Sequence, residues 1–183
     1  MQLEEALLTR RSLSQLGAPA PSAEQLAFAF AAAGRAPDHR LLRPWRYLVI
    51  EGEGLSRLGN LFVASVAASD PARAEAESQR LRQMPQRAPM IVVAILARQE
   101  HPTVPDWEQW LSLGASVQNF LLMLHDQGFA GMWRTGEMAT SATVRDGLGL
   151  QPQEQIAGFI YVGSALADKA APATPEPFWQ VWP

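Results

Sequence analysis

The feature that most limits the fold is an uninterrupted apolar run, Met90–Ala97, with the sequence MIVVAILA. Eight residues of this kind, rich in β-branched side chains, favour a strand. Successive side chains of a strand point to opposite faces of its sheet, so a run without polar positions has to be covered on both sides. The run therefore predicts a strand that is buried on both faces.

Other segments show weaker strand or helix patterns. Strands are predicted at 46–51 and 156–163, and a turn at 52–54. Helices are predicted at 2–9, 55–66 and 108–127 from their apolar spacing. Three more are predicted from their first residues: one from the capping box of Ser22 and Gln25 to Gly34, one that starts at Asp70-Pro71, and one from Ser141 to 147. The helix at 108–127 is apolar on nearly every side, so we expect it in the core or at a subunit interface.

Composition excludes several classes of protein. The 183 residues fit a single domain over 1–183, and the net charge of -3 argues against nucleic-acid binding. Without cysteine there are no disulfides and no thiolate metal site. The first five residues are acidic and polar, and no apolar run is long enough to cross a bilayer, so we expect a cytoplasmic protein without a membrane partner.

The end of the chain combines an Ala- and Pro-rich stretch with large aromatic residues. The tail from about 170 to 183 contains Phe178, Trp179 and Trp182. Disordered tails rarely carry so many aromatic residues. Charged residues make up only 18% of the chain, which suggests that part of its surface is covered by another subunit. We therefore expect the tail to dock, with a partner subunit as one candidate.

Two short stretches cluster cationic groups at predicted helix ends. Arg10-Arg11-Ser12 follows the first helix, and Arg35-Ala36-Pro37-Asp38-His39 follows the second and continues to Pro44-Trp45. Guanidinium groups and a hydroxyl suit a phosphate, so the stretches together favour a phosphorylated, planar cofactor. Each also has a simpler explanation, because cations complement the negative end of a helix or lie in solvent.

A glycine-rich stretch is the third candidate. Residues 128–136 place glycines around Trp133, where backbone can approach a ligand and the indole can pack beside a ring. The alternative is a helix end followed by a strand. His39, His101 and His125 are too scattered for a helical zinc site, and no nucleophile motif or P-loop is present. Any catalysis would then depend on a bound organic cofactor rather than on protein catalytic residues or a metal.

These stretches, in this order, resemble the FMN-dependent nitroreductase family, and most closely its small members. The turn at 50–54, Arg87-Ala88-Pro89, Trp107-Glu108 and Gly131–Gly136 contribute to the resemblance, which covers nearly the whole chain. It implies an α+β protein with a three-layer α-β-α fold and a central, mostly antiparallel sheet. It also implies an obligate homodimer with two FMN molecules at the interface, each contacted by both chains.

The resemblance also implies which residues bind FMN. Arg10 and Ser12 would hold the phosphate and ribityl chain, with Arg11 near the pyrimidine side of the ring and Lys169 as a further phosphate ligand. Arg35 and His39 would come from the opposite subunit. The segment along the isoalloxazine would be Trp133, Arg134, Thr135 and Gly136, where a backbone N–H of Gly136 or Glu137 could reach flavin N5.

Three positions depart from the family pattern. Leu41 and Arg43 stand where many members have Asn and Gln that bind the edge of the flavin, and Ser14 stands where many have a basic residue. We hypothesise that Arg43 stabilises the anionic reduced flavin electrostatically.

The function implied is a ping-pong oxidoreductase. NADH or NADPH would pass hydride to flavin N5, and a nitroaromatic, quinone or similar acceptor would then be reduced. Two alternatives remain: a flavoenzyme of the same fold that acts on a specific metabolite, with 55–84 as its lid, and a non-enzymatic flavin-binding dimer.

Overall fold

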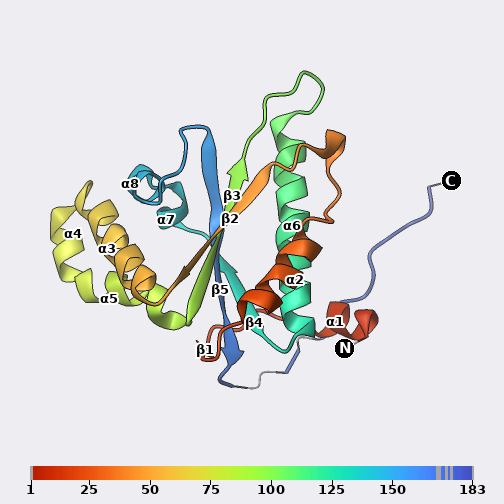
Figure 1. The fold of residues 1–183 in the computed structure, drawn as a ribbon, viewed down its shortest axis with the longest axis horizontal. Coiled ribbons are helices and arrows are strands. Elements are labelled where there is room, and N and C mark those ends of the chain that lie inside the picture. Colours follow the sequence, from red (N-terminus) through yellow and green to blue (C-terminus); the bar gives the residue numbers. More distant parts are fainter. Residues whose placement is uncertain (1, 168–169, 172, 174, 183) are drawn as a thin grey trace.

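A central sheet with helices on both faces forms the core of the computed structural model, which describes residues 2–167, 170–171, 173 and 175–182 (Figure 1). Its strands are β1 (Leu16–Gly17), β2 (Trp45–Glu51), β3 (Met90–Ala97), β4 (Ala130–Arg134) and β5 (Glu154–Ala165). They run in the order β1-β5-β3-β2, β4 also pairs with β5, and every strand pair is antiparallel. The predicted three-layer α+β class is confirmed.

The two helical layers flank this sheet. The helical segments are α1 (Leu3–Thr9), α2 (Ala23–Ala33), η1 (His39–Leu41), α3 (Glu53–Ala67), α4 (Pro71–Ala76), α5 (Ser78–Gln83), η2 (Pro85–Arg87), α6 (Asp106–Asp126), α7 (Glu137–Thr140) and α8 (Ala142–Gly147). Figure 1 shows α3, α4, α5, α7 and α8 on one side of the sheet and α1, α2 and α6 on the other.

The β3 strand spans the predicted run and divides the core in two. Ile91, Val93 and Ile95 pack into the cluster under α3 and α5, whereas the alternate residues, such as Val92, pack against α2 and α6. Seven of its eight residues are buried. Because both faces of β3 are covered, a continuous apolar run is the pattern that the strand requires.

Side-chain caps start three helices where the sequence predicts them. Ser22 and Gln25 form the reciprocal capping box of α2. Asp70 accepts a hydrogen bond from the backbone N–H of Arg73 at the start of α4, and Ser141 does the same for Val144 in α8. Each cap satisfies a backbone donor that the first turn of a helix leaves unpaired.

Some boundaries differ from the sequence prediction. The turn expected at 52–54 is short, because α3 already begins at Glu53. The helix predicted from Asp70 is divided at Glu77 into α4 and α5. The last strand is longer at both ends, and the two-residue strand β1, which no pattern indicated, pairs with its end at Ser164 and Ala165.

One face of α6 is buried and its opposite face is exposed. Leu113, Val117 and Phe120 lie in the core, whereas Trp107 and Leu111 are 60% and 64% exposed. In the tail, the aromatic side chains at 178, 179 and 182 are also exposed on this single chain. Docking of the tail on a partner subunit stays a prediction.

Candidate cofactor-binding site

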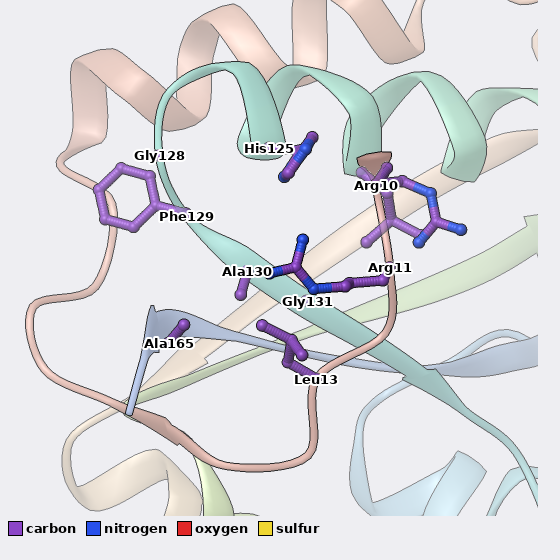
Figure 2. Close-up of a pocket in the computed structure, with 10 residues that line it drawn as sticks. Arg10, Arg11, Leu13, His125, Gly128, Phe129, Ala130, Gly131 and Ala165 are labelled. Atoms are coloured by element: carbon purple, nitrogen blue, oxygen red, sulfur yellow. The ribbon is translucent and has the colours of Figure 1, made fainter. Parts of the chain in front are cut away.

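A cavity of about 180 Å³ opens beside the end of α1 (Figure 2). Arg10 is the C-cap of α1 and Arg11 follows it, and both line the cavity. In Figure 2, His125 points into it from α6, and Arg11 reaches in from the segment after α1. The described residues that line this cavity include no carboxylate. It therefore suits an anion.

His125 is held at the rim by Thr9. The Thr9 hydroxyl donates to the carbonyl of Glu5 at 2.7 Å, so its oxygen accepts from Nε2 of His125 at 2.9 Å. Burial lowers the pKa of His125, and the positive charges of Arg11 and Arg10 lower it further. A bound anion would offset the two positive charges and raise this pKa.

The segment after Arg11 joins the sheet at β4. Ser12 forms an isolated parallel bridge with Gly131, and the backbone N–H of Leu13 donates to the carbonyl of Gly131 at 3.4 Å. A side chain at Gly131 would force Leu121 to move, because a Cβ would lie 2.8 Å from a side-chain carbon of Leu121. The chain therefore brings Arg10-Arg11-Ser12 against β4, the strand that carries Trp133 and Arg134.

The residues at the end of β4 point in different directions. The indole N–H of Trp133 donates to the carbonyl of Ala157 at 3.2 Å, and the indole lies over Gly158, where a Cβ would meet it. The guanidinium carbon of Arg134 lies 5.6 Å from the centroid of the Tyr161 ring, a cation–π contact.

Gly136 follows at the start of α7. Its φ of +94° lies in a region that favours glycine, and a Cβ there would meet nothing within 4 Å. Arg134, Thr135 and Gly136 line a second cavity of about 330 Å³. Within the glycine-rich stretch 128–136, Ala130–Arg134 thus form a strand, which was the simpler of its two interpretations. The end of the stretch also borders a cavity.

Arg35 and His39 lie elsewhere on the chain. Arg35 follows α2 and lines a cavity with Leu3 of α1 and Asn119 of α6. His39 lies at the opposite end of α6, where its Nδ1 is 2.6 Å from Oε2 of Glu108. That end is about 25 Å along the helix axis from His125. One chain therefore does not bring His39 and the cavity of Arg10 and Arg11 together.

The segment around His39 adopts unusual backbone conformations. Arg40, Leu41 and Arg43 have φ values of 62°, 53° and 48°, which non-glycine residues rarely adopt. The carboxylate of Asp38 accepts from the backbone N–H of Arg43 at 2.6 Å and holds the turn. Strain of this kind often accompanies a functional site.

Lys169 lies outside the described residues. Glu108, by contrast, was not predicted as a site residue, although Trp107-Glu108 is part of the family pattern; its contact with His39 joins residues that are far apart in the sequence. Arg87, another residue of the pattern, lines the second cavity with Arg134.

The residues present fit a phosphorylated flavin by their chemistry. Two guanidinium groups, of Arg10 and Arg11, line a cavity whose described lining contains no carboxylate, and the next residue, Ser12, lines a neighbouring cavity with Met132 of β4. The adjoining strand offers Trp133 and the open backbone of Gly136 to a planar ring. Arg10, Arg11, Ser12 and the Trp133–Gly136 stretch would hold FMN. His39 of the same chain is too far away to join them, and Arg35 lines a different cavity.

Fold and site together define an α+β protein with a cation-lined site at one edge of its antiparallel sheet. The model of the nitroreductase family matches residues 7–164. The chain therefore belongs to the nitroreductase family, a family of oxidoreductases, as predicted. It is 39% identical over 165 residues to the Escherichia coli K12 protein named "Putative NAD(P)H nitroreductase YdjA", covering 90% of this chain and 88% of that protein. A Haemophilus influenzae protein named "Putative NAD(P)H nitroreductase" is 36% identical over 163 residues, with 87% and 86% coverage.

Solved structures support the fold. A nitroreductase-like family protein from Bacillus cereus superposes with a TM-score of 0.81 at 23% identity, covering 97% of this chain and 91% of that chain. The FMN- and NADPH-dependent nitroreductase NfnB from Sphingopyxis sp. strain HMH gives a TM-score of 0.76 at 21% identity, with both chains fully covered. In the part of the chain that the structure describes, no helix is long and apolar enough to span a membrane.

Proposed function

We propose that the protein is an FMN-dependent NAD(P)H oxidoreductase that acts as a homodimer, with a nitroaromatic, quinone or similar electron acceptor. The family and its relatives named as NAD(P)H nitroreductases support this proposal. The observation that carries it is the junction of Ser12 with Gly131. This contact places Arg10 and Arg11, which would bind the phosphate, beside β4, which would lie along the isoalloxazine ring.

When bound, FMN would supply the redox chemistry, which is the transfer of two electrons from NAD(P)H to the acceptor. The protein contributes binding and position. Arg10 and Arg11 neutralise phosphate charge, and Ser12 adds a hydroxyl. Gly136, which has an open flank and no side chain, lets the backbone approach a ring closely. Since no protein nucleophile is needed, the rate depends on how the site positions the two substrates and excludes water.

The exposed apolar side chains of α6 are the basis for proposing a second subunit. Trp107, Trp110 and Leu111 are exposed on a helix whose other face is in the core. Large apolar side chains grouped in this way indicate a surface that is covered in the working molecule. His39 is attached to the same helix end through Glu108. If a partner subunit covers this surface, His39 and Arg35 of this chain would contact the flavin that is bound by the partner.

Arg43 remains a candidate for tuning the flavin. Its side chain is exposed on this chain, so its charge is available to a cofactor in the partner. A cation near the flavin ring stabilises the anionic reduced form and raises the midpoint potential. Arg43→Gln should therefore lower the measured potential, and an unchanged potential would contradict this role.

The direct test is the visible spectrum of the purified protein under anaerobic conditions. The proposal requires a flavin spectrum, in the protein as isolated or after FMN is added, and bleaching by NADPH or NADH. A protein that stays colourless and binds no FMN would refute it. Flavin that stays oxidised with both nucleotides would favour the non-enzymatic dimer. Rapid bleaching by NAD(P)H, followed by slow turnover of every nitroaromatic and quinone tested, would favour a flavoenzyme that acts on a specific metabolite.

A further inference from the structure

The second cavity, of about 330 Å³, has an apolar wall and a cationic rim. Phe62, Met84, Met138 and Phe159 contribute apolar side chains, and Arg87 and Arg134 contribute the charge. Pockets of roughly 300 Å³ or more are of the size that binds small organic ligands. The wall and rim together match a ligand with an aromatic body and a negative end.

The two arginines of the rim are not neutralised by the protein. Within the described residues, neither Arg87 nor Arg134 forms an ion pair with a carboxylate. The nearest acidic residue in the sequence, Glu137, instead accepts two hydrogen bonds from Arg73, at 3.0 and 2.7 Å. Arg46, Arg98 and Arg145, by contrast, are each paired with a carboxylate. Arg134 is half-buried and Arg87 is exposed. A cation without a carboxylate partner is available to an anionic ligand.

Both charges act on the same buried group. Tyr161 lines the cavity, and burial raises its pKa, whereas the positive charges of Arg87 and Arg134 lower it. The guanidinium of Arg134 also lies over the Tyr161 ring. Both arginines therefore contribute positive charge to the same cavity.

We infer that this cavity selects the electron acceptor and that it favours aromatic monoanions, such as nitrobenzoates, whose carboxylate is bound by Arg87 and Arg134. The inference rests on the proposed function, because the cavity is lined by Arg134, Thr135 and Gly136 of the stretch assigned to the flavin, so that the acceptor would lie beside the cofactor. Reduction of the nitro group to nitroso takes up two electrons and two protons and releases water. NAD(P)H supplies the electrons and one proton as hydride, and solvent supplies the second proton.

The kinetic test compares 4-nitrobenzoate with its neutral analogue 4-nitrobenzamide. The ratio of their kcat/KM values should favour the anion in the wild type. Arg87→Met should lower this ratio about tenfold, the low end for a charge-assisted hydrogen bond. Arg87→Lys should retain most of it. The matched control is Arg82→Met, because Arg82 is exposed and donates to Asn60 outside the cavity; it should leave the ratio unchanged.

A binding test separates the inference from the proposed function. Calorimetry with benzoate on the purified protein should give an affinity that Arg87→Met weakens about tenfold and that falls with added salt. A ratio unchanged by Arg87→Met would overturn the inference, as would an equal loss of FMN affinity, which would assign Arg87 to the cofactor. A protein that binds no flavin yet binds benzoate through Arg87 contradicts the proposed function but supports the anion site.

Discussion

The Nδ1 atom of His39 lies 2.6 Å from Oε2 of Glu108, 69 positions away in the sequence. A carboxylate only accepts hydrogen bonds, so Nδ1 carries the hydrogen and Nε2 is directed away from Glu108. Glu108 is in the first turn of α6, and the helix therefore fixes the position of the imidazole. Glu108 is thus a positioning residue for the group that we assign to the partner's flavin.

Replacing Glu108 should weaken flavin binding without unfolding the protein. Glu108→Gln removes the charge that holds His39, and we expect the Kd for FMN to rise about three- to tenfold. The control is Asp106→Asn in the same turn, since Asp106 pairs with Arg98 and not with His39. Fluorescence titration of the apoprotein with FMN measures both. Equal affinities in the two variants would contradict the positioning role.

Local patterns in the sequence predicted the elements, and contacts between distant segments explain what they missed. The apolar run fixed β3, and the capping residues fixed the starts of α2, α4 and α8. Glu154 was not expected in a strand, because its burial depends on Arg46, which is 108 positions away. No local periodicity reports such a contact.

For the candidate site too, local patterns predicted the segments, whereas the contacts between distant segments were not predicted. The cationic run and the β4 stretch were predicted from local composition and the resemblance, and the structure joins them through Ser12 and Gly131. The contact of Glu108 with His39 requires the folded chain. The left-handed backbone at Leu41 and Arg43 also gave no signal, since glycine or asparagine is usual there.

Glu154 should matter for stability and for its dependence on pH. It is 6% exposed, its two oxygens accept from Arg46 at 2.5 and 2.7 Å, and one also accepts from the backbone N–H of Gln151. We expect Glu154→Gln to lower the free energy of unfolding by about 2 kcal/mol at pH 7, because Arg46 loses a charged partner. Urea unfolding measures this, with the exposed Glu51→Gln as control.

The same pair predicts sensitivity to acid. The hydrogen bond from Arg46 lowers the pKa of Glu154 below its ordinary value of 4.5. The unfolded chain then takes up a proton at a higher pH than the folded chain, so the stabilisation is complete above 4.5 and is lost as the pH falls below it. Wild type and Glu154→Gln should therefore converge in stability in acid. A constant difference would contradict the ion pair.

His125 should make the protein less stable as the pH falls below neutrality. Burial, with Arg11 and Arg10 close by, lowers its pKa from 6.5, while Asp126 and Glu5 oppose the shift. The folded state therefore favours the neutral imidazole, and stability is full above 6.5 and declines below it. His125→Gln should flatten the decline in melting temperature between pH 7 and 5. His101→Gln, which replaces a ring that contacts Thr103, should not.

The exposed face of α6 gives the sharpest test of the dimer. Leu111 is 64% exposed on the single chain, so Leu111→Asp should leave the monomer folded while placing a charge in an apolar interface. We expect sedimentation velocity to show dissociation at protein concentrations where the wild type is dimeric, with a matching loss of FMN affinity because His39 and Arg35 of the second chain are withdrawn. Gln79→Asp, an equal change of charge on α5 in the other layer, should have neither effect. If Leu111→Asp dissociates the protein but FMN affinity is retained, then each chain binds its flavin alone, and Arg35 and His39 have no part in the partner's site.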